Sequence, residues 1–361
     1  MRLTFLGDIS LCKVDYSSFS IDKQLREILD TSDLVVGNLE CPITLCTEKL
    51  PYQAINLSAP KESLSILDYV NVVSLSNNHI RDYGNKGVFD TIDAISNCNI
   101  GYFGVGGTEE EALEPYVYED ERIRIAFIGA TRYANAQSKE WGTSSDTNRL
   151  LFRKIKQLKK DGFFVIVYFH WGYEYVRVPS PRERRIAHRC IESGADFILG
   201  AHPHIFQGIE GYRGKSIAYS LGNFIFHSSL FDGMSPIEHD DRLFNSFVIS
   251  LDVQNDMSYS FNVFDYVMSD EGVSLAHGVL HEQIMAELDA VSKAIVEKGY
   301  FKKYYMQSYA ISKQNVRIRK DYQKASSLTF FQRLSLYRNA NLQDLCNRIA
   351  GLIISLFQKI K

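Results

Sequence analysis

Residues 195–204, Ala-Asp-Phe-Ile-Leu-Gly-Ala-His-Pro-His, decide how the rest of the chain is interpreted. The first five residues predict a short buried strand, and two histidines, His202 and His204, come just after it. Pro203 restricts the backbone between them. Two neutral imidazoles on one loop are a good start on a metal site, although two solvated loop histidines would give the same short pattern. The ends of the other predicted strands favour the metal site.

Polar residues with metal-binding groups also follow four other predicted strands. We predict these strands at residues 3–6, 34–36, 71–75 and 163–169, with helices between them. Ligands of open α/β sheets bind at the carboxyl ends of the strands, where these polar residues would meet. Besides the two histidines, the residues concerned are Asp8, Asn38, Glu40, Asn78, His79 and His170.

The mixture of donor groups indicates which metals the site would hold. Carboxylate, amide and imidazole ligands suit Mn²⁺, Fe²⁺, Zn²⁺ or Mg²⁺ better than the soft Cu(I) ion. The set is large enough for two divalent ions that share one carboxylate. Two ions about 3.5–4 Å apart can hold a hydroxide and stabilise both oxygens of a displacement reaction. We therefore predict two divalent metal ions as cofactors.

The composition is that of an ordinary globular protein with a large core. The chain has 361 residues, of which 45% are hydrophobic and 23% are charged. The net charge of −3 gives no indication of a nucleic-acid partner. The glycines at residues 104–107 lack the dinucleotide-binding spacing, and the six cysteines form no Cys-x-x-Cys pair.

The hydropathy pattern favours a cytoplasmic protein or one that is peripheral to a membrane. Residues 2–6 open without the basic region and the long apolar stretch that are typical of a secretory signal. The sequence contains no uninterrupted apolar run that is long enough to span a bilayer. We therefore expect neither a signal peptide nor a transmembrane helix in the chain.

The sequence changes character late in the chain, which we divide into residues 1–270 and a basic helical extension, residues 281–361. From Lys313 onward ten basic residues stand against two acidic ones, a net charge of about +8. An apolar stripe at helical spacing is formed there by Leu345, Ile349, Leu352 and Leu356. Such a basic amphipathic helix would lie on an anionic membrane surface, or dock on the core or on a second subunit of a homo-oligomer.

Six motifs at the predicted strand ends show a resemblance. They are, in chain order, Gly7-Asp8, Gly37-Asn38-Leu39-Glu40, Asn77-Asn78-His79 with Asp82-Tyr83-Gly84, His170-Trp171-Gly172-Tyr173-Glu174-Tyr175, His202-Pro203-His204 and Tyr219-Ser220-Leu221-Gly222-Asn223-Phe224. Together they resemble the CapA (PgsA) family of poly-γ-glutamate capsule biosynthesis proteins, within the calcineurin-like metallophosphoesterase superfamily. The resemblance covers about residues 1–270. It implies a four-layer α/β/β/α metallophosphoesterase-like sandwich, to which the C-terminal helical extension is added.

The resemblance also implies a role for each residue of the site. The ligands that it implies are, for the first metal, Asp8 and His204, for the second metal, Asn78, His170 and His202, and, between the two, Glu40. His79 would protonate the leaving group, a role that suits histidine because its pKa lies near neutrality.

Three residues close to these motifs have alternative roles. Asp82 would orient His79, or it would cap the following helix. Glu174 would support a ligand, act as a base or bind metal, or it would form a plain salt bridge. Arg177 and the arginines that follow it would hold an anionic polymer or a phosphate, or they would form a solvated basic face.

Other residues of the site are expected to play supporting roles. Ser10 stands where the first motif of the broad superfamily usually has a histidine, and Asn38 stands where the second usually has an aspartate. We expect Asn38 to contact substrate or to support the ligands. Asn223 is expected to brace the backbone of the site by hydrogen bonds, with a direct role as a metal ligand as the weaker alternative. Arg132 and Tyr133 are expected to line the cleft.

Two functions follow from these observations. The first is a dinuclear metal-dependent hydrolase in capsule or exopolymer biosynthesis, in which a metal-bound hydroxide attacks a phosphoester or a γ-glutamyl amide bond. The alternative is a non-catalytic subunit that binds an anionic polymer or a membrane synthase. The retained ligand set favours the hydrolase, and the basic extension favours the accessory subunit.

Overall fold

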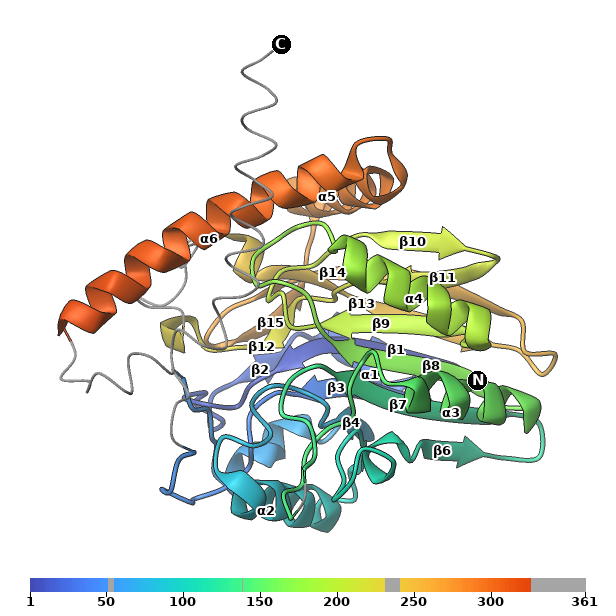
Figure 1. Ribbon diagram of the computed structural model, residues 1–361, viewed down its shortest axis with the longest axis horizontal. Helices are drawn as coiled ribbons and strands as arrows, with labels where there is room; N and C mark the ends of the chain where they lie inside the picture. The colour runs from blue at the N-terminus through green and yellow to red at the C-terminus, as the bar shows by residue number, and fades with distance from the viewer. Residues whose placement is uncertain (51–54, 138, 231–240, 326–361) are drawn as a thin grey trace.

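The computed structural model describes residues 1–50, 55–137, 139–230 and 241–325 (Figure 1). The apolar stripe predicted at residues 345–357, and most of the basic tail, lie outside the described residues. The division of the chain into residues 1–270 and 281–361 stays a prediction.

Among the described residues, nine strands form the first sheet. Their bounds are β1 (Arg2–Ile9), β2 (Ser20–Ile21), β3 (Leu34–Leu39), β4 (Val72–Ser74), β5 (Gly101–Phe103), β12 (Asn223–Ile225), β13 (Asn245–Val253), β14 (Tyr259–Met268) and β15 (Gly272–Leu275). They follow the order β2-β15-β14-β13-β1-β3-β4-β5, and β12 pairs with β1. Because β1, β3, β4 and β5 run parallel, their carboxyl ends meet at one edge of the sheet.

Six strands form the second sheet within the same described ranges. Their bounds are β6 (Tyr116–Glu119), β7 (Arg124–Thr131), β8 (Phe164–His170), β9 (Phe197–Ala201), β10 (Ile209–Tyr212) and β11 (Lys215–Ala218). The order is β10-β11-β9-β8-β7-β6, and the central strands β7, β8 and β9 are parallel. The mostly apolar sequences of these central strands fit their complete burial.

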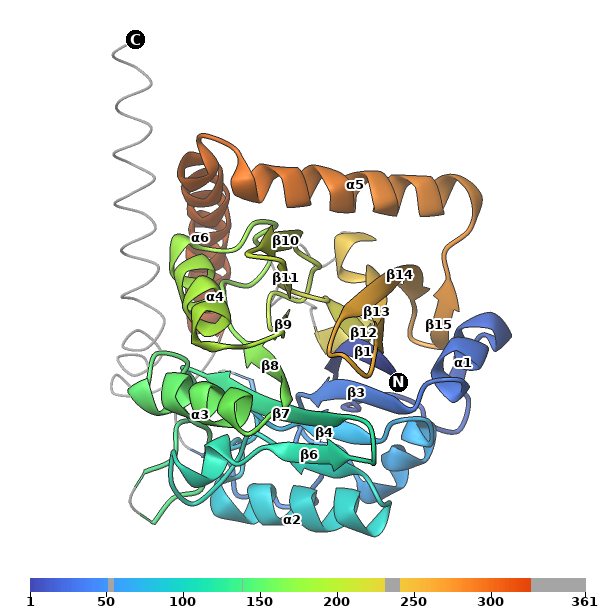
Figure 2. The ribbon, with the colours of Figure 1, turned by 90° about the vertical axis from the view of Figure 1, so that its right-hand side faces the viewer.

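Helices cover the outer faces of both sheets (Figure 2). Their bounds are α1 (Lys23–Asp30), α2 (Gly84–Asn97), α3 (Arg149–Lys160), α4 (Pro181–Ser193), α5 (Gly278–Val296) and α6 (Tyr300–Ala325). The helices α1 and α2 pack on the first sheet, and α3 and α4 pack on the second. The helix α5 lies against β10 and β14.

The inner faces of the two sheets share one apolar core. Phe5 of β1 lies against Phe127 of β7 and Phe197 of β9, with ring centroids 6.4 and 6.2 Å apart. Val36 and Ile166 belong to the same fully buried cluster. Burying one such side chain stabilises the fold by about 1.5–3 kcal/mol. The predicted four-layer α/β/β/α sandwich is thus confirmed.

Two glycines allow backbones to approach closely beside the candidate site. A Cβ atom on Gly7 would lie 1.9 Å from the carbonyl oxygen of Gly222, and one on Gly200 would lie 1.9 Å from that of Tyr219. Only glycine fits at such distances. The Gly7 contact places β12 against the end of β1, where the amide of Asp8 donates to the Gly222 carbonyl at 2.9 Å.

Several elements differ from the sequence prediction. The helix that the sequence predicts at residues 61–69 is a 3₁₀-helix, Lys61–Leu67. The short strands β5, β6, β10, β12 and β15 were not predicted, because each is too short to show a hydrophobic period. The sequence also predicts an antiparallel pair at residues 247–253 and 257–266, and it is confirmed as β13 and β14, in which Val253 faces Tyr259. Among the described residues, no helix combines the length and the apolar character that crossing a membrane requires.

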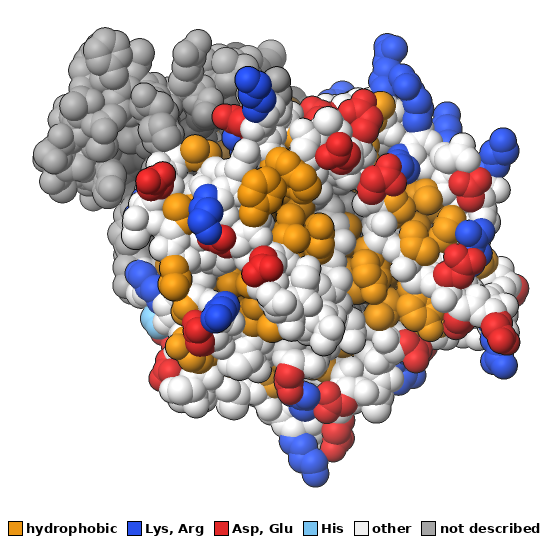
Figure 3. All heavy atoms as spheres, turned by 90° about the horizontal axis from the view of Figure 1, so that it is seen from below, with side chains coloured by type: hydrophobic (Ala, Val, Ile, Leu, Met, Phe, Trp, Pro, Cys, Tyr) orange, Lys and Arg blue, Asp and Glu red, His pale blue; other side chains and the backbone are white. Residues whose placement is uncertain are grey.

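The surface on the side of α2 mixes apolar and charged groups (Figure 3). Phe89 of α2 is 45% exposed, and its ring meets that of Trp141 at a centroid distance of 5.2 Å. Acidic and basic side chains alternate around the apolar patches, which matches the small net charge of the chain.

Candidate metal centre

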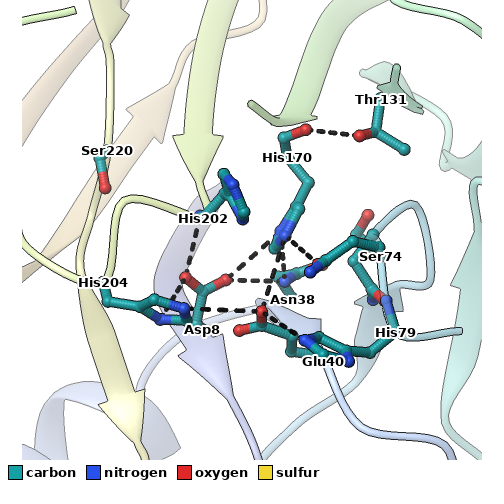
Figure 4. A network of polar contacts seen from close by, with 12 residues as sticks. Asp8, Asn38, Glu40, Ser74, His79, Thr131, His170, His202, His204 and Ser220 are labelled. Atoms are coloured by element: carbon teal, nitrogen blue, oxygen red, sulfur yellow. Dashed lines mark hydrogen bonds and ion pairs between the residues drawn. The ribbon is translucent and has the colours of Figure 1, made fainter. Parts of the chain in front are cut away.

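Glu40 lies at the centre of the polar cluster formed by the strand ends (Figure 4). Its Oε1 atom is 3.6 Å from His170 Nε2, 3.9 Å from His79 Nε2 and 4.0 Å from His204 Nε2. Glu40 is fully buried, yet neither carboxylate oxygen has a hydrogen-bond partner among the described residues. Burial, with a smaller contribution from the neighbouring Asp8, raises the pKa of Glu40 well above its ordinary value.

Asp8 occupies the end of β1 and is also fully buried. Its Oδ1 accepts a hydrogen bond from Asn38 Nδ2 at 2.7 Å, and its Oδ2 accepts one from the backbone N–H of His202 at 2.9 Å. Burial raises the pKa of Asp8 to about 7, against these two hydrogen bonds. The carboxylate is therefore held in place by both sheets.

Three histidines approach from the second sheet. His170 ends β8, while His202 and His204 follow β9. Burial lowers the pKa of His170 and of His202 well below the ordinary value, and it lowers that of His204 to about 4. The rings are therefore neutral at physiological pH, which is the form that binds metal.

The loop that carries two of these histidines has an unusual backbone. His202 has a φ of 96° and His204 a φ of 59°, both in the region that side chains with a Cβ rarely adopt. His204 Nδ1 lies 3.0 Å from Asn223 Oδ1, so Asn223 contacts the ring of this histidine. His202 Nδ1 is buried without a hydrogen-bond partner among the described residues.

The two asparagines of the site contact the same imidazole. Asn78 Oδ1 lies 2.7 Å from His170 Nε2, and Asn38 Nδ2 lies 3.2 Å from His170 Nδ1. Asn38 thus supports Asp8 and His170. Its own Oδ1 is buried and has no hydrogen-bond partner in the part of the chain that the structure describes.

These donors fit divalent metal ions. Two groups bring their ligand atoms within 4.8 Å of one another, Glu40 with His170 and His202, and Glu40 with Asp8 and His204. Glu40 belongs to both groups, as a shared ligand must. Its two buried oxygens and His202 Nδ1 have no hydrogen-bond partner within the described ranges, and a cation would satisfy all three. The buried carboxylates and imidazoles suit the divalent ions named above.

His79 lies at the rim of the cluster and is oriented by Asp82. The His79 Nδ1 atom is 2.8 Å from Asp82 Oδ2, which also accepts the backbone N–H of Leu57 at 2.7 Å. The helix α2 begins after Tyr83 and has no side-chain cap, so the alternative role of Asp82 as a helix cap is wrong. The Nε2 atom of His79 faces Glu40.

The structure places the remaining predicted residues around this cluster. The negative charge of Glu174 is close enough to contribute to the raised pKa of Glu40, after burial and Asp8. Arg177 is turned toward α5, where its Nη2 lies 2.7 Å from Glu287 Oε1 and its Nη1 donates to the Phe206 carbonyl at 3.2 Å. The structure therefore groups Arg177 with α5 rather than with the metal ligands.

The sequence analysis missed Thr131, which supports the site from β7. Its Oγ1 donates to the backbone carbonyl of His170 at 2.6 Å, and the two residues are paired across β7 and β8. A polar residue at the end of one more parallel strand was the signal that could have shown it.

The fold and the cluster define a four-layer α/β protein with a candidate dinuclear metal site at the carboxyl ends of its strands. A model of the family described as "Bacterial capsule synthesis protein PGA_cap" matches residues 2–228, which is well over half of the chain. The chain belongs to this family, and the resemblance to CapA is confirmed.

Curated relatives come from several bacteria. The chain is 34% identical over 247 residues to "Capsule biosynthesis protein CapA" of Bacillus anthracis, a match of 63% of this chain and 60% of that protein. It is 33% identical over 240 residues to "PGA biosynthesis protein CapA" of Bacillus subtilis, covering 63% of each. A "Probable polyglutamine synthesis accessory protein" of Mycobacterium tuberculosis is 28% identical over 214 residues, covering 54% of this chain and 56% of that protein. The matches thus span about three fifths of the length of the Bacillus relatives.

A solved structure is also similar to the chain. A hypothetical protein from Thermus thermophilus aligns with 73% of this chain and 99% of its own, at 16% identity and a TM-score of 0.45.

Proposed function

We propose that this chain is a metal-dependent hydrolase in the biosynthesis of a capsule or exopolymer of the poly-γ-glutamate type. The observation that supports it best is the carboxylate of Glu40, which is buried without a hydrogen bond in the described chain and shared by two groups of ligands. A buried carboxylate in this state costs several kcal/mol unless a cation compensates it. The family and the names of the Bacillus relatives support the biological setting.

The residues divide the work between binding metal and moving a proton. Asp8, Glu40 and His204 would hold one divalent ion, and Glu40, His170 and His202, with Asn78, would hold a second. Ions at these positions would lower the pKa of a water molecule and neutralise charge that develops on the bond being cleaved.

His79 would supply the proton for the leaving group. Asp82 accepts from one of its ring nitrogens and so leaves the other free to face the substrate. The bond would be a phosphoester or a γ-glutamyl amide, because both reactions need an activated water and a proton donor.

An accessory role in polymer synthesis is the second candidate. The name of the Mycobacterium tuberculosis relative, "Probable polyglutamine synthesis accessory protein", favours it. In this role the chain would bind an anionic polymer or a membrane synthase, with the basic extension at the membrane surface or between the subunits of a homo-oligomer. Removing residues 326–361 separates the two functions. Loss of membrane association with unchanged hydrolysis would assign the tail to binding alone.

The first test of the hydrolase is metal content. Protein purified without chelator should carry about two divalent ions per chain, because Glu40 belongs to two ligand groups. The His202→Ala variant should lose metal and hydrolysis of γ-glutamyl peptides and phosphodiesters while remaining folded. The matched control is His281→Ala, since His281 pairs with Asp265 outside the cluster. A His202→Ala protein with full metal content and full activity would refute the ligand assignment.

A further inference from the structure

Arg132 lies beside the candidate metal centre and is not among its ligands. It directly follows β7, whose last residue, Thr131, pairs with His170 at the end of β8. Arg132 and Tyr133 therefore begin their loop at the same sheet edge as the metal ligands.

An aromatic ring connects Arg132 to the centre. The Tyr133 ring lies against the imidazole of His202, with centroids 5.1 Å apart. The guanidinium carbon of Arg132 is 5.0 Å from the centroid of the Tyr133 ring, and Arg132 Nη2 donates to the Tyr133 hydroxyl at 3.1 Å. A full positive charge is thus held one ring away from a candidate ligand.

The guanidinium of Arg132 differs from most of its counterparts. At least eight other arginines of the described residues pair with a carboxylate: Arg2, Arg26, Arg81, Arg124, Arg177, Arg182, Arg184 and Arg213. Arg132 is only partly exposed, yet no carboxylate of the described residues pairs with it. Arginine is the side chain best suited to a planar anion, because its donors form a rigid fork.

Hydrogen bonds fix the backbone that carries Arg132. Thr131 Oγ1 bonds to the carbonyl of His170 and accepts the backbone N–H of Tyr133 at 3.3 Å. Thr143, from the far side of the loop, donates its hydroxyl to the Tyr133 carbonyl at 2.5 Å. The start of the loop is therefore fixed relative to the metal ligands, and a solvated surface arginine would need no such support.

We propose that Arg132 binds a free carboxylate of the polymer next to the bond held at the metal centre. Every residue of a γ-linked glutamate chain keeps its α-carboxylate, and a guanidinium binds a carboxylate through two parallel hydrogen bonds. Tyr133 holds the guanidinium in place, so Arg132 acts as a specificity residue for an anionic polyamide. This inference rests on the proposed function for the polymer and its site, and not on cleavage itself.

The test is equilibrium binding of γ-linked tetraglutamate to the full chain, measured by calorimetry. We compare wild type, Arg132→Gln and Arg132→Lys, with Arg122→Gln as the matched control because Arg122 is exposed in the turn between β6 and β7, at the other end of β7 from Arg132. Arg132→Gln should weaken binding about tenfold or more, Arg132→Lys less, and Arg122→Gln less than twofold. Thermal unfolding and metal content should stay those of wild type.

A second probe identifies the group that Arg132 recognises. The second probe is the tetramer with its α-carboxylates methylated. Its affinity for wild type should be as low as the affinity of the free acid for Arg132→Gln. The Arg132→Gln substitution should not lower the affinity of the ester any further. Equal loss for acid and ester would overturn the proposal. So would unchanged binding of the acid in Arg132→Gln, or the absence of binding to wild type.

Binding of inorganic phosphate tests whether the anion that Arg132 recognises is a phosphate or a carboxylate. If Arg132→Gln weakens phosphate binding and leaves tetraglutamate binding unchanged, Arg132 recognises a phosphoester, and the carboxylate assignment is wrong. Hydrolysis measured on the same samples keeps the two proposals apart. Arg132-dependent binding without any cleavage would leave this inference standing and refute the hydrolase. Cleavage with an unchanged KM in Arg132→Gln would support the hydrolase and refute this inference.

Discussion

Two buried glutamates of this protein, Glu40 and Glu210, differ in the hydrogen-bond donors around their carboxylates. Glu210 of β10 accepts hydrogen bonds from Arg184 at 2.6 Å and from the Tyr219 hydroxyl at 2.6 Å, and lies 3.1 Å from His188 Nε2. Burial alone would raise the pKa of Glu210, but these partners outweigh burial and lower it. Glu40 has no such donors among the described residues, and its pKa is raised.

The comparison distinguishes Glu210, whose carboxylate has a structural role, from Glu40, whose carboxylate is available to a ligand. At Glu210 the protein supplies every donor itself, so the charge ties β10 to α4 and to Tyr219, the residue that follows β11. At Glu40 the protein supplies burial and neutral imidazoles but no donor hydrogen in the described chain. Burying a charge without a partner destabilises a fold, and a cation bound at Glu40 would offset that cost.

The largest expected effect follows from Glu40→Gln. The amide keeps the shape of the side chain and removes the charge, so divalent metal affinity should fall at least a hundredfold, about 2.8 kcal/mol. In chelator, the variant should be at least as stable as wild type, because a carboxyl group whose ionisation burial disfavours has been replaced by a neutral amide. Metal titration and chemical unfolding measure the two quantities. A large loss of metal-free stability would show that Glu40 is structural after all.

The second effect is that of Glu210→Gln. This change leaves Arg184 and His188 without their anion, and the free energy of unfolding should fall by about 2 kcal/mol. The value is below that of a fully buried pair, because the Arg184 side chain is 28% exposed. Urea unfolding in chelator measures it, and metal affinity should not change. If Glu210→Gln loses metal as Glu40→Gln does, the distinction between the two glutamates fails.

A substitution of Asp82 should have a smaller effect than a substitution of either glutamate. The Asp82 Oδ2 accepts from Leu57 and contacts His79, while its Oδ1 is buried without a partner in the described ranges. Asp82→Asn should lower turnover roughly tenfold, because His79 loses a charged partner, and should leave metal content unchanged. Steady-state kinetics on metal-loaded protein measure it. Loss of metal in this variant would make Asp82 a ligand instead of a positioning residue.

The smallest effect is a pH dependence. Because the pKa of Glu210 is lowered in the fold, its stabilisation is fully present above the ordinary glutamate pKa of 4.5. It is lost as the pH falls through the lowered pKa. The gap in unfolding free energy between wild type and Glu210→Gln should therefore be wider at pH 7 than at pH 4. A gap that stays constant with pH would mean that the charge of Glu210 contributes nothing.

The sequence indicated which residues gather at the strand ends better than it indicated their hydrogen-bond partners. Asp8, Glu40 and His170 could be predicted because each follows an apolar strand, and parallel strands end at a common edge. The network of Glu210 could not be predicted, because its donors come from α4 and from Tyr219 after β11 and leave no periodic pattern. Pairing of charges depends on tertiary contacts that neither spacing nor composition records.

The same limit explains the arginines of α4 and of the loop before it. The sequence predicted a group of arginines that would bind an anion or face solvent, namely Arg177, Arg182, Arg184 and Arg185. In the structure Arg182 pairs with Asp146, and Arg184 pairs with Glu210. The strand order of the first sheet was equally hidden, because β12 to β15 join β1 from more than 200 residues away.

The left-handed backbone at His202 and His204 has a consequence for directed evolution. Glycine adopts those angles without steric strain, so replacing either histidine by glycine should remove an energetic penalty of about 1 kcal/mol or more. A library screened for heat resistance alone, in the absence of metal, would therefore accumulate glycine at these two codons. The same screen with metal present would retain histidine, because ion binding then rewards the folded chain.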